Sequence, residues 1–168
     1  MRRALFHLCL ALSLTGCAGY QLGPSNGMAA GGKTIQVQPF VNKALEPRLS
    51  DAVTTSLRKT LQRDGTYKLR TTDASDILLS GSIIVYDRQQ LSYQPNDILT
   101  PRDYRIRIIA QFTATDRSTG KVLLQKTASG RTTVRVGTDL TSAERQALPL
   151  AADDLARNIT SLLVDGTW

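Results

Sequence analysis

Residues 104–115 read Tyr-Arg-Ile-Arg-Ile-Ile-Ala-Gln-Phe-Thr-Ala-Thr, the most regular alternation of apolar and polar side chains in the chain. Successive side chains of a β-strand point to opposite faces of its sheet. The even positions, from Tyr104 to Ala114, therefore predict a face packed on a core. The odd positions, except Ile109, predict a face that meets water or a polar partner.

Further strands are predicted on both sides of this one. They cover residues 34–40, 67–70, 76–87 and 121–136, and residues 116–120 predict the hairpin connection to the last of them. In the strand at 76–87, Val85 is expected on the same face as Ile83. Residues 89–101 contain two prolines and no Lys or Arg, and they predict a long loop.

Two amphipathic helices complete the expected fold. The first has Pro47 in its first turn and ends at Asp64-Gly65. The second is capped by Asp139 or Thr141, and Pro149 should kink or restart it. The order β-α-β-β-β-β-α predicts an α+β fold, a two-layer sandwich with about two helices packed on one face of a mixed four- to five-stranded sheet. The apolar stripes are Leu45, Leu49, Val53, Leu57 and Leu61 in the first helix, and Leu148, Ala151, Leu155, Ile159, Leu162 and Leu163 in the second.

The N-terminus has the layout of a bacterial lipoprotein signal. Two arginines precede an apolar core over residues 4–14, which is shorter than the roughly 20 residues of a membrane-spanning helix, and Leu-Thr-Gly-Cys ends it at Cys17. This pattern predicts removal of residues 1–16 and attachment of a diacylglycerol and an N-terminal acyl chain such as palmitate to Cys17. Two alternatives are an ordinary secretory signal with a chance cysteine and an N-terminal core helix.

The remainder divides into a leader and one domain. Residues 17–33 are rich in Gly and polar residues and predict a lipidated flexible leader, and residues 34–168 predict a single α/β domain. The residue after the cysteine is Ala18, and the absence of aspartate there resembles an outer-membrane address. The expected location is the periplasmic face of the outer membrane, held by the lipid.

Composition limits the chemistry of the mature chain. Removal of the signal leaves 168 − 16 = 152 residues with a formal charge of 7 − 2 = +5, which suits an anionic partner such as phospholipid headgroups or lipopolysaccharide phosphates. Nucleic acid is not expected in the envelope. His7 and Cys9 lie in the signal and Cys17 is lipidated, which excludes Cys/His and Ser/His/Asp catalysis and His/Cys metal sites. We therefore expect no enzyme, metal or cofactor, and the alternative is an envelope hydrolase using only carboxylates, among them Asp87, Asp153 and Asp154.

Several stretches resemble the LptE family of lipopolysaccharide-assembly lipoproteins. They are the mature start Cys-Ala-Gly-Tyr-Gln-Leu at 17–22, Leu-Ser-Tyr at 91–93, Tyr104 opening the alternating strand, and Ala-Ala-Asp-Asp-Leu-Ala at 151–156. The resemblance implies a plug-like subunit that sits inside the outer-membrane β-barrel LptD, binds lipopolysaccharide and helps place it in the outer leaflet. The polar interior of a large barrel would suit the polar sheet face. The alternative is a periplasm-facing regulator or secretion-channel component of the curli-export or penicillin-binding-protein-activator type.

Three arginines are candidates for binding lipopolysaccharide phosphates. Arg88 and Arg102 flank residues 89–101, and Arg135 lies near the end of the last strand, so a hairpin arrangement would gather them at one end of the sheet. The alternative is that they are solvated charges that deter edge-to-edge aggregation.

Overall fold

A computed structural model describes residues 31–72, 75–136 and 139–166 of the chain. In chain order, the elements are β1 (Lys33–Val37), β2 (Val41–Asn42), α2 (Leu49–Asp64), β3 (Tyr67–Arg70), β4 (Ile77–Gln94), β5 (Asp97–Asp116), β6 (Val122–Arg135) and α3 (Leu140–Val164). The strand order is β3-β1-β4-β5-β6, and β2 pairs with β4 outside this path. β1 runs parallel to β3 and β4, whereas β5 is antiparallel to β4 and β6. The predicted α+β sandwich is confirmed, with the short β2 as an additional strand.

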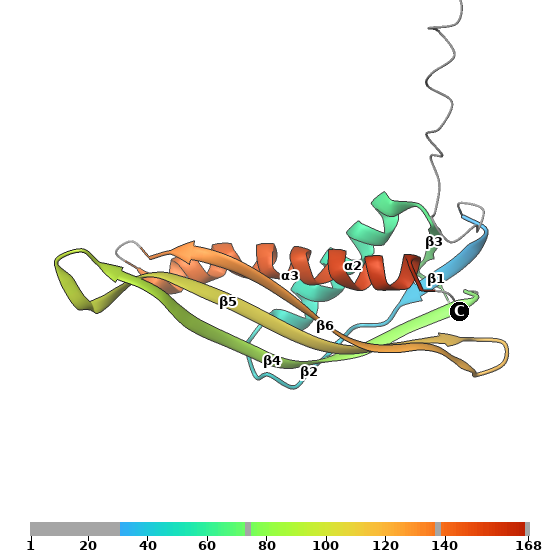
Figure 1. The fold of residues 1–168 in the computed structure, drawn as a ribbon. Helices are drawn as coiled ribbons and strands as arrows, with labels where there is room; N and C mark the ends of the chain where they lie inside the picture. Colours follow the sequence, from blue (N-terminus) through green and yellow to red (C-terminus); the bar gives the residue numbers. More distant parts are fainter. Residues whose placement is uncertain (1–30, 73–74, 137–138, 167–168) are drawn as a thin grey trace, which may run out of the picture.

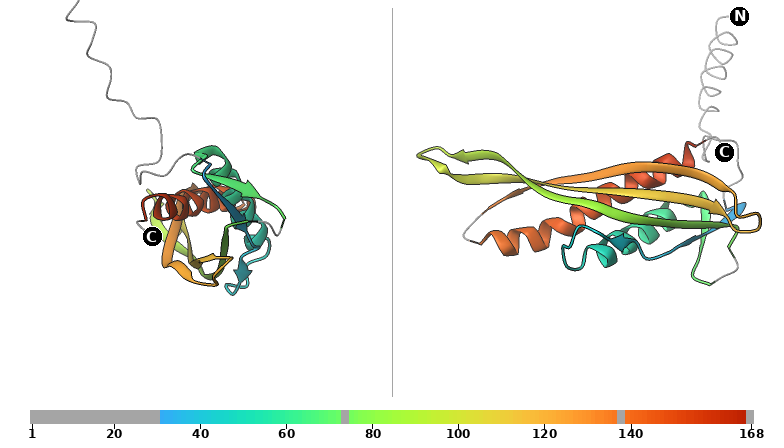
Figure 2. Two further views of the ribbon diagram at one scale, coloured as in Figure 1. Left: turned by 90° about the vertical axis from the view of Figure 1, so that its right-hand side faces the viewer. Right: turned by 90° about the horizontal axis from the view of Figure 1, so that it is seen from below.

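The two helices lie on one side of the sheet (Figure 1). No helix of the described ranges covers its other side, which we call the uncovered face. β4 and β5 are the longest strands, and together they project as a two-stranded hairpin past the start of α3. The tip of this hairpin lies at the opposite end of the domain from β1 and β3 (Figure 2).

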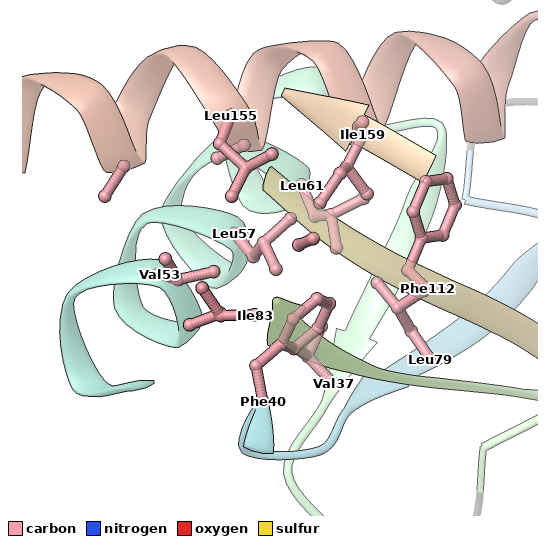
Figure 3. Packing of buried hydrophobic residues seen from close by; sticks show 14 of the residues in the cluster. Val37, Phe40, Val53, Leu57, Leu61, Leu79, Ile83, Phe112, Leu155 and Ile159 are labelled. Atoms are coloured by element: carbon pink, nitrogen blue, oxygen red, sulfur yellow. The ribbon is translucent and has the colours of Figure 1, made fainter. Parts of the chain in front are cut away.

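The core lies between the sheet and the helices. The even positions of β5 from Ile106 to Ala114 are at most 1% exposed, which confirms the alternation in the sequence. Figure 3 shows Leu57 and Leu61 of α2 facing Leu155 and Ile159 of α3, with Phe112 beside them. The other fully buried members include Ile35, Leu49, Val53, Ile77, Leu79, Ile83, Ala151, Ala152, Ala156 and Leu163.

Gly130 allows β6 to approach α3 closely. A Cβ atom at this position would lie 2.4 Å from the carbonyl oxygen of Ala151 and 2.4 Å from the backbone nitrogen of Leu155. On either side of the glycine, side chains of α3 form hydrogen bonds with the backbone of the free edge of β6. The Nδ2 of Asn158 donates to the Ser129 carbonyl at 2.7 Å, and the Arg131 N–H donates to Asp154 Oδ2 at 2.9 Å. These bonds satisfy edge groups that would otherwise be open to another strand.

The helix ends follow the sequence in part. Gly65, with φ 75°, ends α2 as predicted. Asp139 caps α3, because its carboxylate accepts the N–H groups of Thr141 and Ser142 at 2.9 and 3.2 Å. Pro149 lies inside α3 without ending it, so the predicted restart is wrong.

The start of the first helix is also corrected. Leu45 belongs to the predicted stripe but lies in a loop, with φ 61° and 90% of its surface exposed. Pro47 precedes α2 instead of occupying its first turn. The periodicity of the stripe therefore continues one step beyond the helix itself.

The predicted loop over residues 89–101 is wrong. β4 continues to Gln94 and pairs there with Asp97, so only Pro95 and Asn96 connect the two strands. A bulge between Ile83 and Val85 also shifts the register. Val85 consequently pairs with Ile109 on the uncovered face, not on the core face as predicted, and Tyr86 takes the core side opposite Ile108.

Candidate functional site

The expected lipid site, Cys17, lies outside the described residues, as do the signal and most of the leader. The described chain begins beside β3, where the Gly31 N–H donates to the Thr66 carbonyl at 3.0 Å. Within the described ranges, neither helix combines the length and the apolar character that crossing a bilayer requires.

Two of the three candidate arginines converge on one carboxylate at the base of the hairpin. Arg102 Nε lies 2.9 Å from Asp103 Oδ2, and Arg135 Nε lies 3.1 Å from Asp103 Oδ1. The Ser92 hydroxyl also donates to Asp103. Hydrogen bonds from Ser92 and then Arg102 lower the pKa of Asp103 to about 2, so the carboxylate is ionised at neutral pH.

Arg88 lies apart from this pair. It is opposite Ile106 on the side of the sheet that faces α3, and its Nη1 lies 2.8 Å from Glu144 Oε1. This hydrogen bond and the charge of Glu144 raise the pKa of Arg88. The structure therefore gathers Arg102 and Arg135 on Asp103, while Arg88 links the hairpin to α3.

The uncovered face carries further arginines that the search for phosphate ligands missed. Arg107 forms a two-pronged ion pair with Asp87, at 3.0 Å from Nε to Oδ1 and 2.7 Å from Nη2 to Oδ2. Arg131 stands directly opposite Arg107 across the β5–β6 pair. Arg105, one row nearer the tip, lies 3.5 Å from Gln89 Oε1. The alternation at 104–115 placed Arg105 and Arg107 on this face, but Arg131 joins them only through the β5–β6 register.

The tip of the hairpin combines exposed apolar side chains with polar ones that are mostly uncharged. Leu91, Tyr93 and Leu99 are 39%, 47% and 85% exposed, and residues 89–101 contain no Lys or Arg. Large exposed apolar side chains that gather in one place indicate a contact with another molecule. The tip is therefore a second candidate contact region beside the charged base.

A groove of about 880 Å³ separates the first half of α2 from the first half of α3. Tyr86, Ala52, Leu148 and Pro149 contribute its apolar lining. Burial raises the pKa of Tyr86 to about 12, so its hydroxyl stays protonated at neutral pH. The groove thus combines an apolar lining with charged side chains of both signs, among them Lys59, Glu144, Arg145 and Asp153.

The carboxylates of the hydrolase alternative lie on different elements. Asp87 is paired with Arg107 on the uncovered face, whereas Asp154 of α3 accepts from the Arg131 N–H and from Arg157. Asp153 lines the groove between the helices. Over the described ranges, no group of three or more His, Cys, Asp or Glu side chains is arranged to hold a metal ion.

The overall arrangement, a two-layer α+β domain, is shared with solved structures of distant sequence. The minor lipoprotein of Acinetobacter baumannii aligns with a TM-score of 0.52 and 16% identity, covering 79% of this chain and 93% of its own. A protein of Xanthomonas campestris aligns with a TM-score of 0.61 and 12% identity, covering 86% of this chain and 91% of its own. At these identities the likeness establishes the fold alone.

The sequence identifies the family. The model of the LptE family, described as lipopolysaccharide-assembly, matches residues 32–163, and the chain belongs to this family. No curated protein sequence matches the chain. The chain is therefore a member of a family that serves in lipopolysaccharide assembly, and the resemblance seen in the sequence is confirmed.

Proposed function

We propose that the chain is an outer-membrane lipoprotein that acts as a plug and assembly subunit of the LptD β-barrel, and that it assists the insertion of lipopolysaccharide into the outer leaflet. The family match over residues 32–163 carries this proposal. The shape of the domain supports it, because a narrow domain with a projecting hairpin suits the interior of a large barrel. The uncovered face also carries polar side chains, among them Gln111, Thr113 and Arg107, which suit the polar lining of such a barrel. We further propose that it works by binding and not as an enzyme.

In this proposal Cys17 holds the domain at the periplasmic face of the outer membrane. One acyl chain gives only reversible membrane binding, whereas a diacylglycerol together with an N-terminal acyl chain holds a protein stably. Cys17→Ala is therefore expected to release the protein from washed outer membranes. Equal retention of Cys17→Ala and the wild type, together with an unmodified mass for the wild type, would exclude the lipid anchor.

Arg88, Arg102 and Arg135 are the proposed contacts for lipopolysaccharide phosphates. Each already has a carboxylate partner, Glu144 or Asp103, so a phosphate would compete with these ion pairs. The triple Ser variant is expected to retain less phosphorylated glycolipid at moderate salt. Unchanged retention of the glycolipid by the triple variant would show that its phosphates bind to other residues.

The test of the whole proposal is purification of the lipidated chain from outer membranes of its own host. Recovery of a large outer-membrane barrel in stoichiometric amount is the expected result. Recovery of a peptidoglycan synthase or of a ring of this chain, with no barrel, would instead support the regulator or secretion-channel alternative.

A further inference from the structure

The side chains of the uncovered face form rows that cross β4, β5 and β6. Beyond the row Leu78–Thr115–Val122, where β4 also pairs with β1, come two polar, uncharged rows, Ser80–Thr113–Gln125 and Ser82–Gln111–Thr127. The next row, Val85–Ile109–Ser129, is largely apolar. Two rows closer to the tip contain arginines: Asp87–Arg107–Arg131 and Gln89–Arg105–Thr133. We call these last two the arginine rows.

The arginine rows carry positive charge that the domain does not neutralise. Asp87 is paired with Arg107, and Asp103 is shared by Arg102 and Arg135. Neither the guanidinium of Arg105 nor that of Arg131 forms an ion pair in the part of the chain that the structure describes, and only the backbone N–H of Arg131 donates to a carboxylate, that of Asp154. Like charges directly opposite each other, as in the Arg107–Arg131 pair, destabilise a sheet. An arrangement that costs stability in the isolated domain is offset when an acidic partner binds there.

The geometry of these rows matches another sheet. Rows on one face repeat every two residues, about 6.6–6.8 Å along a strand, and a second sheet stacked on this face has the same repeat. Carboxylates on alternate residues of a facing strand can therefore reach Arg105 and Arg131 in successive rows. Guanidinium groups bind such carboxylates with two parallel hydrogen bonds.

The rows beside the arginines also favour a protein over a lipid headgroup. A phosphorylated headgroup would occupy the arginines and leave the Val85–Ile109 row and the two polar rows without a partner. A protein wall would cover these five rows, with polar side chains against polar side chains and acidic ones against the arginines.

We propose that the uncovered face of β4, β5 and β6 is the docking surface for the inner wall of the partner barrel, and that acidic residues of this wall bind Arg105 and Arg131. This inference rests on the proposed function, because it takes a β-barrel as the partner. It assigns the contact to Arg105 and Arg131, which are different residues from the proposed phosphate contacts Arg88, Arg102 and Arg135.

The test compares two double variants that change the net charge equally. Arg105→Glu/Arg131→Glu alters the arginine rows, and Lys59→Glu/Arg145→Glu alters exposed positions on the helices. Each lipidated variant is purified from its host's outer membrane, and the recovered barrel is quantified. The first variant is expected to recover at least tenfold less barrel than the wild type, and the helix variant to recover nearly as much. Arg105→Gln/Arg131→Gln, which adds no repulsion, should show an intermediate loss, and thermal unfolding of each purified domain checks that it folds.

Three results would overturn the inference. Barrel recovery by the Arg105/Arg131 variants equal to that of the wild type would remove the arginine rows from the contact. An equal loss in the helix variant would show a general effect of charge. If the Arg105/Arg131 variants still recover the barrel but lose a phosphorylated glycolipid, the uncovered face binds the lipid instead. If the wild type itself recovers no barrel, the proposed function is wrong, and the wild-type purification shows this without any variant.

Discussion

Replacing Gly130 with Ala tests how α3 is held against the sheet. Gly130 needs no unusual backbone conformation, because the described glycines with a positive φ are Gly31, Gly65 and Gly120. The glycine is required only for space. An added Cβ would lie 2.4 Å from Ala151 O and 2.4 Å from Leu155 N, both backbone atoms of a helix.

The magnitude follows from this geometry. Non-bonded heavy atoms pack at about 3.5–4.0 Å, so α3 must retreat from β6 by about 1 Å. Overpacking of this kind costs about 1–3 kcal/mol, and rigid backbone on one side favours the upper value. The same retreat lengthens the hydrogen bonds of Asn158 to Ser129 and of Arg131 to Asp154. We expect a loss of about 3 kcal/mol, or about 10 °C in melting temperature for a domain of this size.

Urea and thermal unfolding of the domain, followed by circular dichroism, measure this loss. Gly120→Ala is the matched control, because it adds the same methyl group where nothing lies within 4 Å but where φ is +71°. Its cost should be the backbone strain alone, about 1–2 kcal/mol. A Gly130→Ala variant within about 0.5 kcal/mol of the wild type, the usual range for substitutions at neutral surface sites, would refute the close approach of β6 to α3.

Three further changes have definite expected outcomes. Asp103→Asn should reduce stability near neutral pH: the folded-state pKa of Asp103, about 2, lies below its ordinary value of 3.8, so its stabilisation is present above about pH 4 and is lost as pH falls toward 2. A constant difference from the wild type over that range in acid unfolding would contradict this. Tyr67→Phe should cost about 1 kcal/mol by removing the hydrogen bond from its hydroxyl to the Leu163 carbonyl. Because burial raises the pKa of Tyr67 to about 12, the wild type should also lose stability as pH rises from 10 to 12, and Tyr67→Phe should lose less. Asp139→Ala should cost about 1 kcal/mol through loss of the α3 cap, whereas Thr141→Ala should cost little.

The parts of the fold that the sequence predicts well are those with one buried face. The alternation from Ile106 to Ala114 and the four-residue steps from Leu49 to Leu61 each record the side that packs on the core. A period of two or of nearly four is visible only when burial selects apolar residues at that period. Both elements accordingly appear in the structure as strand and helix.

The hairpin is missed for the same reason. Beyond Arg88, most residues of β4 are exposed, so burial selects neither face and the alternation fades. Hydrogen bonds to β5 hold these residues in an extended conformation. The local amino-acid composition does not reveal such pairing with a distant strand. Pro95 and Pro101 suggest a loop but stand at the turn and at an irregular position opposite Tyr93, where a missing N–H is tolerated.

The candidate site shows a related limit. Composition led to arginine as the candidate side chain, but the register of the strands decides which arginines lie next to one another. Arg102 and Arg135 meet at Asp103 because Asp103 pairs with Arg135 across two strands, and Arg131 reaches Arg107 in the same way. Arg88 falls on the other side of the sheet because one bulge near Ile84 shifts the register of β4.

The position of the leader gives the proposed contacts a direction. From Cys17 to Gly31 the chain has fourteen Cα–Cα steps, which reach at most about 50 Å when fully extended. A lipid on Cys17 would therefore keep the β1–β3 end of the domain within that distance of the anchoring leaflet. The hairpin lies at the opposite end of the domain, so its tip would extend away from the tether, with the arginine rows at its base. A contact made by the tip alone could tilt, whereas a contact that includes the arginine rows holds the uncovered face flat against its partner. Loss of the Arg105 and Arg131 charges should therefore loosen the orientation of the domain as well as its affinity.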